Sequence, residues 1–109
     1  MLRVLPQHHQ EVILITRILT IIVYPNRMNE WFVYVVRNTG DILYTGITKD
    51  TARRVDEHNK GCGAKFTRGR GPWKLAYSEG PFDHGDALRR EMAIKKDASL
   101  KREIKARPL

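Results

Sequence analysis

The sequence predicts a single α+β domain built on a small, mostly antiparallel sheet. The chain has 109 residues, enough for one domain with a modest hydrophobic core. Short segments rich in valine, isoleucine, tyrosine and phenylalanine alternate with helical patterns in the order β-β-α-β-α-α. Two strands in direct succession favour an antiparallel hairpin, and this order with later helices is typical of the α+β class.

The composition is that of a globular chain with excess positive charge. Hydrophobic residues make up 41% and charged residues 29%, and 20 basic against 12 acidic residues give a net charge of +8. A small basic domain is biased toward polyanions, above all nucleic acid. Cys62 is the only cysteine, so neither an intrachain disulfide nor a cysteine-based zinc site is possible. We therefore expect a reducing, cytoplasmic setting.

The first 28 residues differ from the rest. Their apolar run, EVILITRILTIIVY, is interrupted by Arg17 and is shorter than the roughly 20 apolar residues of a membrane helix. It also lacks the basic start and small-residue cleavage site of a signal peptide. We expect an N-terminal extension, either an accessory strand or the product of an upstream start codon, followed by the domain proper over 29–109. No membrane association is expected.

Two strands are predicted over 31–37 and 42–47, joined by Asn38-Thr39-Gly40. A three-residue loop ending in a left-handed glycine fits a type I turn with a bulge. That loop places Arg37 across from Asp41, an opposite-charge pair.

In the same register Tyr34 lies directly opposite Tyr44, and both side chains point to one face of the sheet. Gly46 then lies on that face beside Tyr44 and leaves a shallow notch. A glycine in a strand often marks close approach by a backbone or a ligand. The alternative is an ordinary strand end at a bulge, which the hairpin alone favours.

The first helix is predicted over 51–60, capped by Asp50 and ended by Gly61. Arg54 and His58 lie one turn apart on the edge of its less polar face. The alternative for Arg54 is an aliphatic stem that covers the core edge while its charge reaches water.

A third strand is predicted over 73–78, followed by a helix that begins at Asp83 or Asp86 and reaches about Lys96. Ser99 is expected to cap a final short helix. The apolar arc of the second helix is Ala87, Leu88, Met92 and Ile94.

Glu91 falls in the middle of this arc. A carboxylate on a buried face is costly unless it is paired or binds a metal. An ion pair with Lys95 or Arg54 is one solution. The other is a divalent cation, magnesium by preference, because its ligands are oxygens and waters.

The segment 61–72 is a glycine-rich basic loop. Its positive side chains, together with Lys74 just after the loop, alternate with Phe66 and Trp73. Basic side chains with aromatic neighbours suit a nucleic-acid strand. The alternative is a flexible, solvated loop. The predicted nucleic-acid-binding residues are Lys65, Arg68, Arg70 and Lys74.

Together these residues resemble the GIY-YIG nuclease domain. The resemblance covers about residues 30 to 105 and rests on "FVY" at 32–34, "YTG" at 44–46, Arg54, His58 and Glu91. The stretches "LYTGIT" and "ALRREMAIKK" are similar to the small stand-alone YhbQ-like bacterial branch. "TARRVDEHN" and "RGRGPW" also resemble the eukaryotic structure-specific nuclease subunit. The first triplet departs from Gly-Ile-Tyr but keeps its tyrosine.

The resemblance implies a three-stranded antiparallel sheet flanked by helices and metal-dependent hydrolysis of phosphodiester bonds. It implies Mg²⁺, with Mn²⁺ as the alternative, on Glu91, and contact of Arg54 with the scissile phosphate. Tyr34 is our expected general base, Tyr44 would orient the attacking water, and His58 would assist proton transfer. The expected catalytic residues are Tyr34, Tyr44, Gly46, Arg54, His58 and Glu91.

The expected function is therefore structure-selective cleavage of DNA in repair or recombination. RNA remains open as a substrate, as do the oligomeric state and a protein partner for targeting. Two alternatives remain: a non-catalytic nucleic-acid-binding module, and a nuclease subunit that is active only with a partner.

Overall fold

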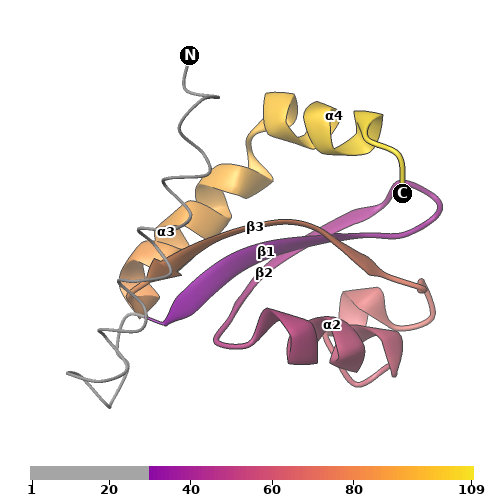
Figure 1. Cartoon of the computed structure of the whole chain (residues 1–109), viewed down its shortest axis with the longest axis horizontal. Helices are drawn as coiled ribbons and strands as arrows, with labels where there is room; N and C mark the ends of the chain where they lie inside the picture. The colour runs from indigo at the N-terminus through magenta and orange to yellow at the C-terminus, as the bar shows by residue number, and fades with distance from the viewer. Residues whose placement is uncertain (1–29) are drawn as a thin grey trace.

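A computed structural model of the chain describes residues 30–109, and the predicted N-terminal extension lies outside this range. The described residues form a three-stranded antiparallel sheet in the order β2-β1-β3. Helix α2 covers one face of the sheet, and α3 and α4 cover the other (Figure 1). This arrangement confirms the predicted α+β class. The elements are β1 (Trp31–Arg37), β2 (Leu43–Thr48), α2 (Thr51–Asn59), the 3-10 helix η2 (Lys65–Thr67), β3 (Lys74–Phe82), α3 (His84–Lys95) and α4 (Ala98–Ala106).

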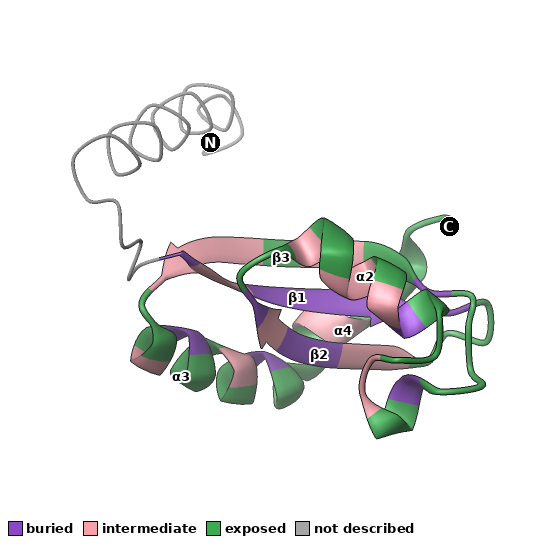
Figure 2. Ribbon diagram, turned by 90° about the horizontal axis from the view of Figure 1, so that it is seen from below, coloured by how far each residue is buried: buried purple, intermediate pink, exposed green. Residues whose placement is uncertain are grey.

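The central strand β1 supplies the core on both sides of the sheet (Figure 2). Its side chains alternate between the two faces. Val33 and Val35 pack against residues of α3 and α4, whereas Tyr34 and Val36 form a second cluster with Trp73 on the α2 side. A tyrosine hydroxyl is thus buried beneath α2, where it needs a hydrogen-bond partner.

The predicted hairpin register is wrong by two residues. Tyr34 lies opposite Gly46, and Tyr44 lies opposite Val36, so the tyrosines share a face but are diagonal neighbours. The loop therefore spans five residues, 38–42, instead of three. The side chain of Asn38 lengthens it by accepting hydrogen bonds from two later backbone N–H groups of the loop, at 3.0 and 2.9 Å.

The left-handed residue of this loop is Asp41, with φ of 61°, and not Gly40 as predicted. Aspartate tolerates this conformation better than most residues with a side chain. The predicted ion pair is confirmed, with 2.7 Å between Arg37 Nη2 and Asp41 Oδ1. The Arg37 guanidinium also donates to three carbonyl oxygens at the end of α4, between 2.6 and 3.2 Å. It thereby anchors the last helix to the hairpin.

The helix starts follow their capping residues. Asp50 accepts a hydrogen bond from a first-turn N–H of α2, as predicted, and Asp83 does the same for α3. The predicted Ser99 cap is wrong because Asp97 caps α4 and starts it earlier. Strand β3 runs to Phe82 instead of 78 because its pairing with β1 continues to Trp31.

Candidate active site

The buried hydroxyl of Tyr34 meets His58 beneath α2. The Tyr34 Oη and His58 Nε2 atoms are 2.7 Å apart, and the two residues are 1% and 2% exposed. Tyr34 comes from the central strand and His58 from the last turn of α2. The His58 imidazole therefore packs against the sheet, further inward than the predicted position on the edge of the less polar face of α2.

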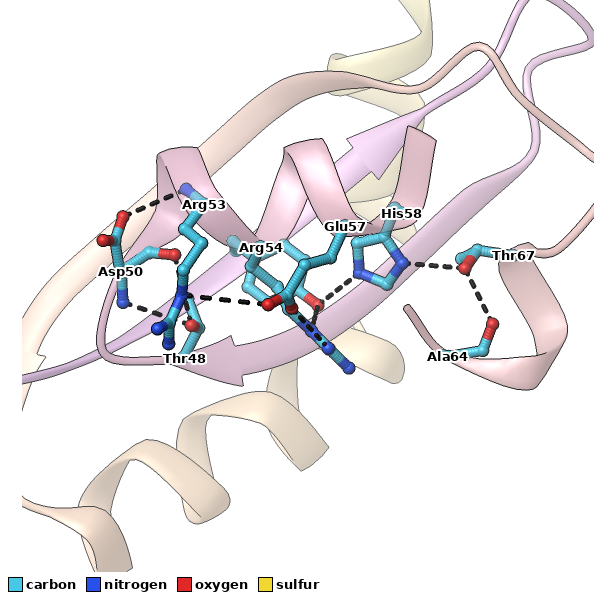
Figure 3. A network of polar contacts seen from close by, with 9 residues as sticks. Thr48, Asp50, Arg53, Arg54, Glu57, His58, Ala64 and Thr67 are labelled. Carbon is cyan, nitrogen blue, oxygen red and sulfur yellow. Dashed lines mark hydrogen bonds and ion pairs between the residues drawn. The ribbon is translucent and has the colours of Figure 1, made fainter. Parts of the chain in front are cut away.

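The direction of this hydrogen bond follows from Thr67. The Thr67 hydroxyl donates to the carbonyl oxygen of Ala64 at 2.9 Å, so its oxygen accepts from His58 Nδ1 at 2.7 Å (Figure 3). With the hydrogen on Nδ1, the Nε2 atom is an acceptor. The phenol of Tyr34 therefore donates its proton to His58.

Arg54 completes the cluster from one turn earlier in α2. Its Nε donates to Tyr34 Oη over a long 3.4 Å, and its Nη1 donates to Glu57 Oε1 at 2.9 Å. These bonds use Nε and Nη1 and not Nη2. Because the side chain is 31% exposed, a solvent-borne anion can reach the guanidinium. The predicted arginine and histidine thus converge on one tyrosine oxygen.

The surroundings keep the Tyr34 phenol and the His58 imidazole neutral. Burial raises the pKa of the Tyr34 phenol, and the nearby Arg54 charge only partly opposes this. Burial lowers the pKa of His58, and the positive charge of Arg54 lowers it further. At neutral pH the cluster therefore holds a phenol and a neutral imidazole, the protonation states in which the imidazole accepts the phenol proton.

Two glycines make room for this pair. A Cβ atom on Gly46 would lie 2.7 Å from Tyr34 Oη, so the phenol rests directly against the Gly46 backbone. The predicted open notch beside Tyr44 is therefore wrong, because the Tyr34 ring fills it. A Cβ atom on Gly63 would overlap the His58 ring, which gives that glycine a packing role.

Tyr44 forms the rim of the cluster. Its ring centroid lies 5.3 Å from that of His58 and 6.5 Å from that of Tyr34. On its other side it stacks with Phe66, with centroids 6.0 Å apart and an interplanar angle of 19°. Tyr44 is only partly buried and links the buried pair to the surface.

Glu91 lies on α3, on the opposite side of the sheet from α2. Its carboxylate is 3.0 Å from Lys95 Nζ, one of the two predicted ion pairs, and its side chain is 17% exposed. The predicted apolar arc is wrong in part, since Leu88 and Met92 are 41% and 59% exposed. Burial is the main cause that raises the pKa of Tyr34, and the negative charge of Glu91 adds to it.

The donor set around Glu91 is compatible with magnesium. Within residues 30–109 no group of three or more histidine, cysteine, aspartate or glutamate side chains forms a ready metal cage. Magnesium is usually held by one or two carboxylates, with waters and substrate phosphate oxygens completing the shell. A single partly exposed carboxylate fits that requirement.

The glycine-rich loop is held in place from beneath. The Asn59 side chain bonds both backbone groups of Trp73, at 2.6 and 3.0 Å, and the Trp73 indole donates to the Thr67 carbonyl at 3.0 Å. The Arg70 guanidinium lies 4.6 Å from the centre of the Phe66 ring. These contacts hold the backbone of the loop in place while its basic side chains face solvent. All four predicted binding residues are exposed: Lys65, Arg68, Arg70 and Lys74.

Sequence reasoning missed Thr67, Gly63 and Asn59, which orient or accommodate the cluster. The sequence indicates a basic loop for a nucleic-acid strand over 61–72, and this interpretation gives no reason to expect the segment to pack against α2. A histidine that faces the core does signal a need for two hydrogen-bond partners. Nothing in the sequence indicates that Thr67 is one of them.

The structure thus defines a small α+β domain whose candidate site combines two tyrosines with the arginine and histidine of α2. The chain belongs to the GIY-YIG family: the model of the GIY-YIG catalytic domain matches residues 30–103. No helix among the described residues is long and apolar enough to cross a membrane.

Within this family the chain is similar to UPF0213 proteins, which agrees with the predicted YhbQ-like branch. It is 47% identical to a UPF0213 protein of Cronobacter sakazakii over 62% of this chain and 72% of that protein. It is 46% identical to the UPF0213 protein YhbQ of Escherichia coli O1:K1 over 62% and 68%. A solution NMR structure of a Bacillus halodurans UPF0213 protein is 37% identical, covers 67% of this chain and 78% of that one, and has a TM-score of 0.40.

Proposed function

We propose that the protein is a metal-dependent endonuclease that hydrolyses phosphodiester bonds in DNA. The observation that carries this proposal is the convergence of Arg54 and His58 on the buried oxygen of Tyr34. Hydrolysis needs an arginine for the phosphate charge, a path for the water proton and a Lewis acid near the leaving oxygen. This cluster offers the first two, and Glu91 offers a carboxylate for the third.

Arg54 is the proposed phosphate ligand. A guanidinium can hold two phosphate oxygens through paired N–H groups, which a lysine cannot copy. Arg54 now donates to Glu57, whose side chain is 34% exposed. An arriving phosphate can therefore compete with Glu57 for Nη1 while also binding Nη2.

Tyr34 and His58 form the proposed proton path. A free phenolate is unfavourable here because burial raises the pKa of Tyr34. If Tyr34 Oη accepts a proton from the attacking water as its own proton passes to His58 Nε2, no phenolate accumulates. The water oxygen then bonds to phosphorus, the bond to the leaving oxygen breaks, and the leaving oxygen departs as an alkoxide that takes a proton from solvent. The proton removed from the attacking water rests on His58 as an imidazolium.

Substrate binding favours this transfer. The charge of Arg54 is one of the causes that lower the pKa of His58. A phosphate bound to Arg54 compensates that charge and makes the imidazole a better proton acceptor. The His58 imidazole thus becomes more basic when the substrate is bound.

Glu91 would hold the metal. Mg²⁺ or Mn²⁺ bound there would polarise the phosphate and stabilise the departing oxygen as a Lewis acid. In the described structure Lys95 neutralises Glu91 at 3.0 Å and must move aside for a cation.

Cleavage assays test the proposal directly. We would incubate labelled single-stranded, duplex, flap and branched DNA, and matched RNA, with the wild type and with Arg54→Ala in Mg²⁺. Arg53→Ala is the matched control, because Arg53 is the preceding residue of α2 and its side chain is 68% exposed. Loss of cleavage in Arg54→Ala alone supports the site. Equal cleavage by all three proteins, free of host nuclease, refutes it.

The substrate panel also addresses biological role. We propose structure-selective cleavage in DNA repair or recombination, for which flap and branched substrates should be cut faster than plain duplex. A wild type that binds every substrate and cuts none, alone or with added partner, would leave the binding-module alternative.

A further inference from the structure

The outer edge of β2 carries a basic groove beyond the proposed catalytic cluster. The groove has a volume of about 730 Å³, and it is lined by the first three residues of β2, 43–45, and by the loop residue before them, Ile42. Successive side chains of a strand alternate between faces, so the groove follows the strand edge. Strand β2 is the outermost strand on that side of the sheet. We call this feature the β2-edge groove.

Three lysines from the two helices behind the sheet line the groove. Lys95 lies at the end of α3, and Lys101 and Lys105 lie one turn apart on α4. Among residues 30–109 neither α4 lysine forms an ion pair. Like charges four residues apart on a helix repel each other, so an anion between them is favourable.

Glu91 offsets the charge of Lys95 at 3.0 Å, and the charges of the two α4 lysines remain. The acidic lining residue of the groove is Asp41, whose carboxylate already accepts two hydrogen bonds from Arg37, at 2.9 and 2.7 Å. The remaining field is positive. A line of such charges along a groove suits the regularly spaced phosphates of a nucleic-acid backbone.

Tyr44 connects the groove to the catalytic cluster. It lines the groove, and its ring is also 5.3 Å from the ring of His58. Phe66 lies at the same end, stacks with Tyr44 and is 45% exposed. Exposed aromatic rings beside basic side chains are typical of nucleic-acid-binding grooves.

Lys95 joins the two regions electrostatically. It lines the groove, and its Nζ atom is 3.0 Å from the Glu91 carboxylate. A phosphate in the groove gives Lys95 a second anionic partner. Occupation of the groove therefore helps to release Glu91 for a cation.

We propose that the β2-edge groove binds the phosphate backbone of a nucleic-acid strand on one side of the scissile bond. This inference rests on the proposed function for the identity of the scissile bond. It adds Lys95, Lys101 and Lys105, on the far side of Tyr44, to the basic residues of the glycine-rich loop. The strand then passes along both flanks of Tyr44.

Binding without cleavage tests the groove separately from catalysis. We would measure the anisotropy of a fluorescein-labelled 20-nucleotide DNA strand, its duplex and the matching RNA in EDTA from 50 to 200 mM KCl. The groove variant is Lys101→Gln with Lys105→Gln. The control is Lys96→Gln with Arg102→Gln, which removes the same charge from exposed positions that do not line the groove. Thermal unfolding confirms that both variants fold.

The groove variant should bind about fivefold to tenfold more weakly, and the control should change less than twofold. Loss of two phosphate contacts should also reduce the slope of log K against log salt by roughly 1.4 for a single strand and 1.8 for a duplex. Equal losses in groove and control variants would overturn the proposal.

Binding of an acidic peptide of 15 glutamates tests whether the groove takes a protein partner instead of a nucleic acid. If the groove variant loses this peptide but keeps the oligonucleotides, the groove is a protein-docking surface and the proposal is wrong. The cleavage assay separates the two proposals. A wild type that cuts DNA, with a groove variant of unchanged affinity, overturns the groove alone. A wild type that never cuts, with a groove variant of weakened affinity, overturns only the hydrolysis.

Discussion

Replacing Gly46 by alanine should disable the site without removing any polar group. The new Cβ atom would lie 2.7 Å from Tyr34 Oη and 2.9 and 3.0 Å from two ring carbons. Ordinary contact begins near 3.4 Å, so the phenol must shift by about 0.7 Å. A shift of that size away from His58 would stretch the 2.7 Å bond between Tyr34 and His58 to about 3.4 Å and weaken it sharply.

The energetic consequence combines two effects. Overpacking a tight site costs about 1–3 kcal/mol, and loss of a buried hydrogen bond adds about 1 kcal/mol. The two effects add to about 2–4 kcal/mol, which lowers the melting temperature of a domain of this size by roughly 8–32 °C. Loss of the proton path should also lower the cleavage rate by about 100-fold or more.

Gly40→Ala is the matched control in the same hairpin. The nearest atom to its new Cβ would be Asn38 Oδ1 at 3.5 Å, and Gly40 is not in a left-handed conformation. Melting temperature and single-turnover cleavage should stay near wild type. Combining Gly46→Ala with Tyr34→Phe removes Tyr34 Oη, the atom nearest to the new Cβ atom. The double variant should therefore regain part of the lost stability, but it should regain none of the activity. If Gly46→Ala melts and cleaves like Gly40→Ala, the assigned packing of Tyr34 is wrong.

The hydrogen bonds of Thr67, His58 and Asn59 can each be tested by a single substitution. Thr67→Val should destabilise the fold by about 1–3 kcal/mol and slow cleavage, because it leaves the buried His58 Nδ1 hydrogen unpaired, and Thr67→Ser should restore both. The lowered pKa of His58 means that the unfolded chain binds more protons, so the melting temperature should fall as pH drops below about 6.5 and the slope should flatten in His58→Gln. Asn59→Ala should cost about 1–3 kcal/mol by freeing both backbone groups of Trp73, seen as faster hydrogen exchange in the glycine-rich loop. Wild-type stability and cleavage rate in Thr67→Val would contradict the bond from His58 to Thr67. A melting temperature that does not change with pH would contradict the buried, neutral state of His58. Unchanged hydrogen exchange in Asn59→Ala would contradict the bonds from Asn59 to Trp73.

Local signals in the sequence predicted most of the fold. Alternation placed Tyr34 and Tyr44 on one face, and the Asp50 cap and the spacing of Arg54 and His58 located the inward side of α2. These features depend on chain neighbours and on the strand and helix periods. They therefore need no knowledge of tertiary contacts.

The features that sequence reasoning missed depend on side chains meeting across the fold. The hairpin register turned on the Asn38 side chain, which holds a five-residue loop open where a shorter turn also fits. The role of Thr67 appears only when the glycine-rich loop folds back under His58. The approach of the phenol to Gly46 followed from the corrected register. None of these contacts has a periodic signature.

Cleavage by Glu91→Gln, measured in Mg²⁺ and in EDTA, decides whether this site performs metal-dependent hydrolysis. Glu103→Gln is the control, because Glu103 is an exposed carboxylate that is likewise ion-paired four residues along a helix, at 3.3 Å. Hydrolysis by this site predicts that the wild type and Glu103→Gln cut DNA only in Mg²⁺, while Glu91→Gln folds normally and cuts in neither condition. Wild-type cleavage by Glu91→Gln, or undiminished cleavage by the wild type in EDTA, would contradict it.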